Sequence, residues 1–402
     1  MRLNFYLRGL NKTEDPKAEN ELVGPNGEIV GRVKNGRPKF FPDYYVIPMS
    51  LDKDNDAQEA FNMIDYFKRN GVLVKELKED TGSYKKGDLV IDMAQAKRGY
   101  ANHILYKGSN ESAWAAMYAE LLVNFPDMKG FKAEPVFKDG LFAGKLGEVT
   151  ATRATRTSEI DPKAPYYVIA NTSASAVQAV NKAISQGKSV YLTDDGYIVD
   201  RDTFASLLPN YAIYGEALYK VPNGPTLKPL KIYSPNYHYN WTGVDAPAHT
   251  SLVLEKLGFQ IVDTPDEADV IVLENNRFDA SIFGKKPTLV IGGEAMQKLE
   301  KLGVLSGFDA EKLKGGSDYE GLMKAIIDDQ DPLTSGYKKN ALFYSNSGNW
   351  IEKVPSNFKT LMSIASSDYY IAGWWPKNEV LANKVMAISG ELLGQPLFVY
   401  AG

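Results

Sequence analysis

Apolar and polar positions alternate most regularly between Lys228 and Met296, where short apolar runs are separated by segments of helical periodicity. The apolar runs predict strands at 230–233, 259–262, 269–273 and 288–291, and the periodic segments predict helices at 247–258 and 295–302. Later apolar runs predict further strands at 341–344, 369–372, 386–389 and 397–400. Strands that alternate with helices are typical of βαβ crossovers, so we expect an α/β domain with a doubly wound, mainly parallel sheet.

A second pattern occurs twice in the first half of the chain. It predicts a strand, a helix and two strands at 43–47, 55–70, 72–74 and 89–91, and again at 165–169, 175–186, 189–192 and 196–200. We interpret the two stretches as copies of one β-α-β-β unit, at about 41–93 and 163–202. The core is predicted to contain four residues of each copy: Tyr45, Ile47, Ile64 and Val74 in the first, Tyr167, Ile169, Ile184 and Val190 in the second.

The segments between and around these copies carry weaker patterns. They predict a polar loop at 93–102, a helix at 111–124 and a hairpin within 131–160. The turn-rich residues 222–225 suggest a domain boundary. We therefore expect a linker or the end of an upstream domain at 1–37, a duplicated α/β region at 38–227 and a second α/β domain at 228–402. The last predicted strand has no helix behind it, so we expect this domain to be truncated at its C-terminus.

Composition limits the functions that the chain can have. A chain of 402 residues with 44% hydrophobic and 24% charged residues is typical of a soluble protein with two or three domains. The net charge of −4 and the lack of a basic block argue against nucleic-acid binding. The chain has no apolar run near the length of about 20 residues that a membrane span needs. The absence of cysteine excludes disulfides, thiolate zinc sites and cysteine nucleophiles, and it is compatible with export.

The sequence lacks the usual catalytic signatures. Its three histidines are His103, His238 and His249, and none begins a His-x-x-Glu or His-Glu-x-x-His motif, so we expect no zinc site in this chain. There is no Gly-x-Ser-x-Gly motif. The strand predicted at 288–291 runs through Gly292 and Gly293 directly into a helix, as at a nucleophile elbow, but no Cys or Ser lies in the turn. We therefore expect no acyl-transfer chemistry there.

Polar and aromatic side chains follow several predicted strands of the last domain. Ligands of open α/β sheets bind beyond the carboxyl ends of the strands, so these side chains are candidates for a binding surface. The candidate residues are Tyr237, His238, Tyr239, Trp241, Glu274, Asn275, Glu294, Asn346, Trp374 and Trp375. The alternative is that the aromatic side chains pack against a neighbouring domain, and the sequence leaves both interpretations open.

Several of these segments resemble a known family. Residues 44–48 (YYVIP), 70–72 (NGV), 87–95 (GDLVIDMAQ), 97–102 (KRGYAN) and 117–119 (MYA) resemble the region that follows the catalytic domain in large bacterial zinc carboxypeptidases, which are carboxypeptidase A-like metallopeptidases. Residues 231–273 and 371–376 (IAGWWP) resemble the class I glutamine amidotransferase-like module, of flavodoxin-like fold, at the C-terminus of the same proteins. The resemblance covers about 38–402, and the catalytic His-x-x-Glu of the family has no counterpart.

The resemblance implies that this chain is a non-catalytic accessory region of an exported zinc carboxypeptidase that hydrolyses peptides. It implies a parent protein that is secreted or held in the cell envelope, and a partner in its own upstream peptidase domain, where the zinc is expected. A peptide or a glycan is a further expected partner. The alternative is a stand-alone peptide- or glycan-binding module that uses the aromatic strand ends. The reading frame upstream of Met1 discriminates between the two.

Overall fold

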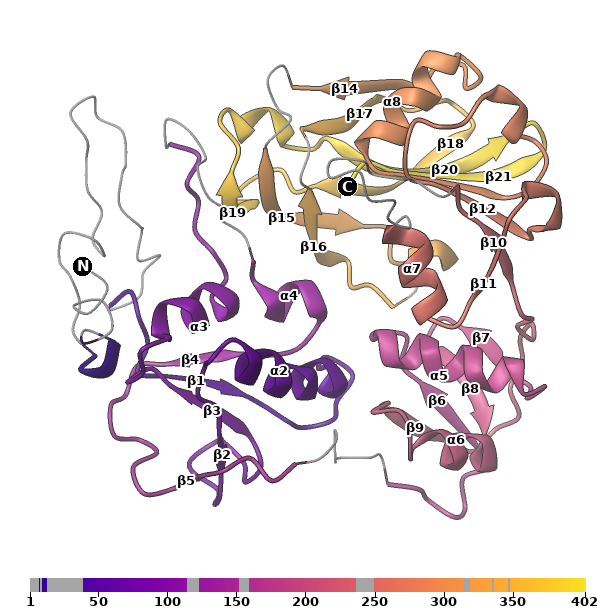
Figure 1. Cartoon of the computed structure of the whole chain (residues 1–402). Coiled ribbons are helices and arrows are strands. Elements are labelled where there is room, and N and C mark those ends of the chain that lie inside the picture. Colours follow the sequence, from indigo (N-terminus) through magenta and orange to yellow (C-terminus); the bar gives the residue numbers. More distant parts are fainter. Residues whose placement is uncertain are drawn as a thin grey trace. The chain divides into compact units, whose positions relative to one another are not determined.

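The structure is a computed structural model that describes residues 7, 9–12, 39–113, 123–151, 159–235, 249–313, 319–334, 336–345 and 348–402. It is a mixed α/β fold with three sheets in the described part of the chain (Figure 1). The chain forms two compact units, and the sheets are therefore described one at a time. Most of the helix predicted at 111–124 lies outside the described residues, and its described ends, 111–113 and 123–124, are not helical.

The first sheet has five strands in the order β4-β1-β3-β2-β5, and every neighbouring pair is antiparallel. Its elements are β1 (Tyr44–Ile47), α2 (Ala57–Arg69), β2 (Lys75–Leu77), β3 (Leu89–Asp92), α3 (Arg98–Leu105), α4 (Phe125–Lys129), β4 (Glu134–Val136) and β5 (Leu146–Gly147). Strand β3 lies between β1 and β2, so the α2 crossover joins two strands that are not neighbours. This is the split βαβ arrangement.

The second sheet repeats this topology. Its elements are β6 (Tyr166–Ile169), α5 (Ala174–Ser185), β7 (Tyr191–Thr193), β8 (Gly196–Asp200), α6 (Arg201–Leu207) and β9 (Gly215–Leu218). The strand order β7-β8-β6-β9 corresponds strand by strand to β2-β3-β1-β4 of the first sheet. The eight predicted core residues are confirmed as buried, with exposed fractions between 0% and 8%.

Three expectations for the first copy and the segments that follow it were wrong. Residues 72–74 are not a strand, because ladder pairing begins only at Lys75, opposite Val90. The described residues 131–151 form no hairpin, because β4 pairs with β1 and β5 pairs with β2 at opposite edges of the sheet. The polar loop at 93–102 ends early, since Arg98 begins α3 and the apolar side chains of that helix are buried.

The third sheet has twelve strands and carries the last domain. Its elements are β10 (Lys231–Tyr233), α7 (His249–Lys256), β11 (Gln260–Val262), β12 (Val270–Leu273), β13 (Thr288–Ile291), α8 (Gly293–Leu302), β14 (Asp309–Lys312), β15 (Glu320–Ile327), β16 (Asn340–Ser345), β17 (Asn349–Lys353), β18 (Phe358–Ile364), β19 (Tyr370–Trp374), β20 (Val385–Leu392) and β21 (Gln395–Tyr400). Neighbours in the run β11-β10-β12-β13-β21 are parallel. Strand β21 therefore lies inside the sheet, between β13 and β20.

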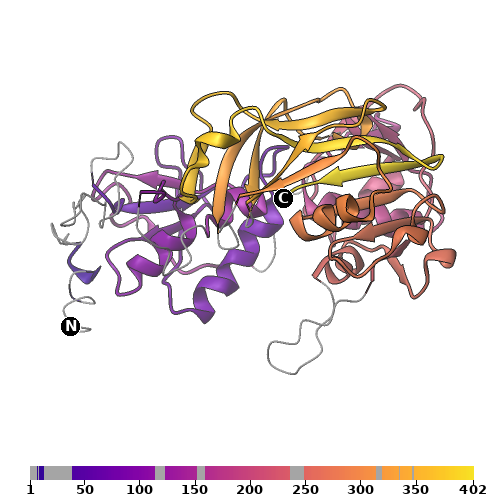
Figure 2. The same cartoon turned by 90° about the horizontal axis from the view of Figure 1, so that it is seen from above.

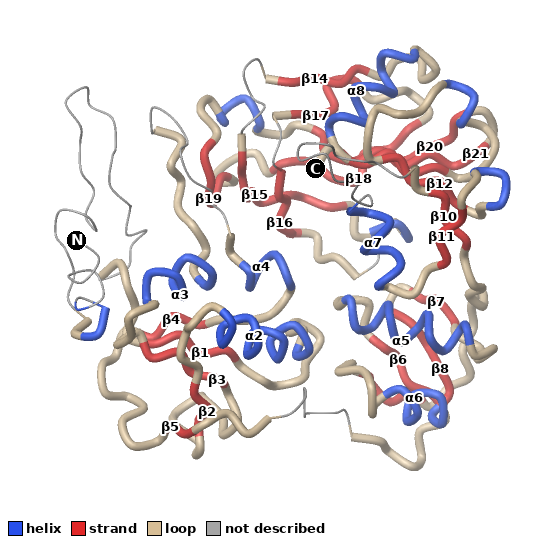
Figure 3. Tube along the Cα trace, in the orientation of Figure 1, coloured by secondary structure: helices blue, strands red, loops and turns tan. Residues whose placement is uncertain are grey.

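The expected doubly wound, mainly parallel sheet is present only in part. Beyond β21 the sheet continues as β20, β18, β15 and β16, and these neighbours are antiparallel. After residue 320 the described chain consists mainly of strands (Figures 2 and 3). The two-residue turn Leu393-Gly394 between β20 and β21 has positive φ at both positions, as tight hairpins require. So short a connection leaves no room for a crossover helix, and β20 and β21 are therefore antiparallel.

The third sheet has a continuous apolar core. Helix α8 contributes Ala295, Met296 and Leu299, which pack with Leu273 of β12 and Val290 of β13. These side chains recur at helical spacing, so one face of α8 is buried and the other remains polar. No helix in the described ranges is long and apolar enough to cross a bilayer. The core fixes the start of α8 at the carboxyl end of β13.

Candidate functional site

The connection from β13 to α8 is a glycine turn with restricted geometry. Gly292 has φ +88° and ψ 156°, a combination that side chains oppose and glycine tolerates. Its N–H donates to the carbonyl oxygen of Tyr400, 2.8 Å away on the neighbouring strand β21. This hydrogen bond holds the turn against the sheet.

Gly293 has no space for a side chain. A Cβ atom at this position would lie 2.0 Å from Nδ2 and 2.4 Å from Cγ of Asn349. Asn349 is itself only 2% exposed, so it cannot move away freely. The side chain of Asn349 thus occupies the place where a residue in this turn would project.

The first turn of α8 offers unpaired N–H groups. The first intrahelical hydrogen bond of the helix runs from Met296 N to Gly292 O, at 3.0 Å. The N–H groups of the first three helical residues precede it, and the cap residue Gly292 has no side chain to accept from them. Such a helix start has a positive electrostatic potential and suits an anion or the acceptor of a polar ligand.

Two neighbouring strand ends meet at this turn. The loop after β12 brings Asn276 to Glu294, and Nδ2 of Asn276 donates to Oε1 of Glu294 at 2.5 Å. Two predicted residues of that loop, Glu274 and Asn275, hold it in place. Glu274 accepts a hydrogen bond from the Thr250 N–H of α7 at 3.2 Å, and Oδ1 of the buried Asn275 accepts the N–H of Arg277 at 2.8 Å.

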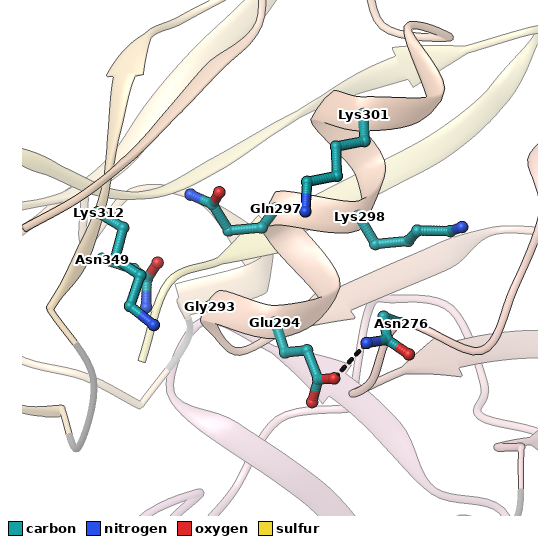
Figure 4. A pocket seen from close by; sticks show the side chains of 8 residues that line it. All are labelled: Asn276, Gly293, Glu294, Gln297, Lys298, Lys301, Lys312 and Asn349. Atoms are coloured by element: carbon teal, nitrogen blue, oxygen red, sulfur yellow. Dashed lines mark hydrogen bonds between the residues drawn. The ribbon is translucent and has the colours of Figure 1, made fainter. Parts of the chain in front are cut away.

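A cavity of about 680 Å³ lies beside the start of α8. Figure 4 shows the residues that line it: Asn276, Gly293, Glu294, Gln297, Lys298, Lys301, Lys312 and Asn349. Three are lysines and one is acidic, so the wall is positively charged overall. Of the predicted site residues, Glu294 lies on this wall.

Sequence reasoning missed the opposite wall of the cavity. Lys312 and Asn349 are register partners on the antiparallel pair β14 and β17, and neither strand was predicted. The spacing of Lys298 and Lys301 was a usable signal, because residues three apart lie on the same side of a helix. Asn349 gave no signal, because only its tertiary position beside Gly293 distinguishes it from other polar residues.

Two residues of the predicted aromatic surface, Trp374 and Trp375, lie in the described part of the chain. Trp375 is a core residue with an exposed fraction of 0%, and its ring lies 5.8 Å from that of Tyr319. It therefore offers no stacking face, because the core of the third sheet covers it. Trp374 is half-buried at the end of β19 and is not among the residues that line the cavity. The other candidates lie outside the described residues: Tyr237, His238, Tyr239, Trp241 and Asn346.

Within the described ranges, no group of three or more His, Cys, Asp or Glu side chains is arranged to hold a metal ion. The cavity wall instead consists mainly of lysines and amides. This donor-rich set suits polar contacts to an organic ligand.

No family model matches the chain, and no curated protein matches it. Solved structures that resemble part of it include a protein described as a GMP synthase subunit from Thermoplasma acidophilum, with 17% identity and a TM-score of 0.29, covering 43% of this chain and 83% of that one. A glutamine amidotransferase from Thermotoga maritima has 10% identity and a TM-score of 0.27, covering 42% and 74%. A ThuA-like protein from Parabacteroides merdae has 11% identity and a TM-score of 0.27, covering 43% and 79%.

Proposed function

We propose that this chain is a non-catalytic accessory region of an exported zinc carboxypeptidase, and that its last domain binds ligand without reacting with it. The zinc-bearing peptidase domain belongs upstream in the parent protein. The sequence motifs at 44–48, 87–95 and 371–376 suggest this parent. The cavity beside α8 is the part of the last domain that the proposal assigns to binding.

The filled turn at Gly293 carries the non-catalytic part of the proposal. An acyl-transfer site of the nucleophile-elbow type needs a nucleophile at the strand–turn–helix junction and an environment that stabilises an anionic intermediate. The junction here has glycine at both turn positions, and Asn349 occupies the space beside Gly293. Glu294 adds a negative charge in the first helical turn, which opposes a developing oxyanion. These features argue against turnover at this junction.

Glutaminase and esterase assays on the purified chain test this proposal. We expect no turnover of glutamine or of an activated ester by the wild type, and no change in the Glu294→Ala variant. Turnover by the wild type that the variant loses would make Glu294 catalytic and would overturn the proposal.

The second candidate is a stand-alone peptide- or glycan-binding module. The half-buried Trp374 is the described residue that favours it. Sequencing the gene upstream of Met1 separates the two candidates: a zinc-peptidase domain in frame supports the accessory role, and a bare signal peptide supports the stand-alone module.

A further inference from the structure

The two copies of the split βαβ unit differ in how the second face of the sheet is covered. Side chains along a strand alternate between the two faces. In β6, Tyr167 and Ile169 are buried, and the Tyr167 ring stacks on that of Phe204 in α6 at 4.3 Å. Tyr166 and Val168 point to the other face and are only half-buried. The second copy therefore leaves apolar side chains partly exposed on the side away from α6.

In the first copy the chain itself closes the same face. Strand β1 has the same Tyr-Tyr-Val-Ile sequence as β6, but its residues Tyr44 and Val46 are buried. Phe142 packs with them in one apolar cluster, and its ring meets that of Tyr44 edge-on, with centroids 5.0 Å apart. The first copy thus shows what this face accepts, which is an aromatic side chain.

The segment that would form this cover in the second copy is shorter and exposed. In the first copy the aromatic cover comes from residues 137–145, which join β4 to β5. After β9 the chain pairs with β7 as early as Pro225, whose carbonyl oxygen accepts the Leu192 N–H at 3.3 Å. Tyr219 and Val221 of the intervening segment are 64% and 75% exposed. These side chains therefore do not cover the sheet.

Strand β9 also leaves the edge of its sheet open beside this face. It is the last strand in the order β7-β8-β6-β9. The Ala170 N–H donates to the carbonyl oxygen of Tyr214 at 3.3 Å, and hydrogen-bonded pairs alternate along an antiparallel ladder. By this alternation, Ala217 directs its N–H and C=O away from β6. Neither group has a partner among the described residues, and Ala217 is exposed.

The first copy blocks the corresponding edge with a proline. Pro135 of β4 corresponds to Ala217 of β9, because each pairs with the second tyrosine of its Tyr-Tyr-Val-Ile strand. Proline has no N–H to offer and is a common block on edge strands. The first copy is therefore closed at both its edge and its face, and the second copy is open at both.

We propose that β9 binds an extended segment of a different polypeptide as an added strand. Leu218 is half-buried and pairs with Tyr166 on the open face. An aromatic side chain of the bound segment covers these two residues, as Phe142 covers the face in the first copy. Main-chain hydrogen bonds to Ala217 hold the segment, and the aromatic side chain selects it. This inference concerns the duplicated region and goes beyond the binding role proposed for the last domain.

Fluorescence anisotropy with the full chain tests the ligand class. The probe is a labelled peptide of sequence TKTFTKT with blocked ends, in which the phenylalanine and the lysines lie on one face of the strand. We expect saturable binding. The same peptide with alanine in place of phenylalanine should bind about tenfold more weakly, because partial burial of a phenylalanine ring is worth about that factor. The two peptides have equal charge, so the comparison excludes a purely electrostatic contact.

Variants of the edge and of the face locate the site. Ala217→Pro reproduces the block of the first copy and should weaken binding about tenfold, through one lost hydrogen bond and the bulk of the ring. Ala217→Ser keeps the N–H and is the matched control, which should bind like the wild type. Tyr166→Thr leaves the edge intact and removes the apolar contact, so it should weaken binding about fivefold even where Ala217→Pro fails to fold.

Each part of the proposal can fail separately. Equal affinities of the Ala217→Pro and Ala217→Ser variants would overturn strand addition, and equal affinities of the two peptides would overturn the aromatic cover. Absence of binding to the wild type would overturn the site as a whole. Sedimentation of the wild type as a dimer that Ala217→Pro converts to a monomer would identify a second copy as the occupant, and would overturn binding of a different polypeptide.

Discussion

At the residue scale, Gly293 is where packing and helix propensity make opposite demands. An alanine in a helix is normally more stable than a glycine by about 0.8–1.0 kcal/mol. At Gly293 the added methyl group would overlap the buried amide of Asn349. The steric cost must therefore exceed the propensity gain.

We expect Gly293→Ala to lower the free energy of unfolding by about 1–3 kcal/mol, the usual cost of overpacking. Chemical denaturation measures this change. The double variant Gly293→Ala/Asn349→Ala should lose less than the two single changes combined, because the overlap is gone. A single alanine that stabilises the protein would show that the Asn349 side chain moves aside freely.

Asp56 gives a residue-scale prediction about pH. It caps the start of α2, where its Oδ1 accepts the N–H groups of Gln58 at 3.0 Å and Glu59 at 3.1 Å. Burial raises the pKa of Asp56 from 3.8 to about 6, although these hydrogen bonds act in the opposite direction. Between these values the unfolded chain releases a proton that the folded protein keeps. Stability from this group is therefore complete below about pH 4 and falls as the pH rises to about 6.

The Asp56→Asn variant tests this effect, because asparagine keeps the cap and removes the charge. A pKa change of 1 equals about 1.4 kcal/mol, so the loss in the wild type is at most on the order of 3 kcal/mol. Across this pH range, the melting temperature of the variant should increase relative to that of the wild type as the pH rises. A constant difference between the two proteins at every pH would rule out a raised pKa.

At the scale of elements, the two split βαβ sheets depend on equivalent strands. Ile47 in β1 and Ile169 in β6 are both 0% exposed and occupy corresponding positions in the two copies. Each side chain fills a close-packed interior, where a truncation leaves a cavity.

Ile47→Ala and Ile169→Ala should each lower the free energy of unfolding by about 2–5 kcal/mol. Leu73→Ala is the control, because Leu73 is 63% exposed and its truncation should change stability by no more than about 0.5 kcal/mol. Urea denaturation of the three variants provides the comparison. If either isoleucine variant is as stable as the Leu73 variant, that strand does not hold its sheet together.

At the scale of the whole molecule, we expect the purified chain to hold no stoichiometric zinc and to release no C-terminal residues from peptides. The reason is that the chain has only three histidines and that none of them begins a His-x-x-Glu motif. Metal analysis and a carboxypeptidase assay check both points. Tight zinc binding together with chelator-sensitive hydrolysis would contradict the accessory role. The control for surface binding is the purified chain with zinc added, which should hydrolyse no peptide.

The sequence by itself determined the features that depend on local pattern. Periodicity located β13, α8 and the duplicated core positions, because burial of one face imposes a regular spacing on apolar residues. The sequence also showed that no Cys or Ser lies between Gly292 and Glu294, because the residue types of the turn are known without a structure.

Only the tertiary structure decided what surrounds that turn. Strands β14, β15, β17 and β18 joined the sheet in antiparallel order, and their short or mixed patterns do not specify a partner. Strand pairing is non-local, so it alone brought Lys312 and Asn349 together and placed Asn349 against Gly293. Trp375 became a core residue for the same reason, since burial depends on what packs over a side chain and not on its position after a strand.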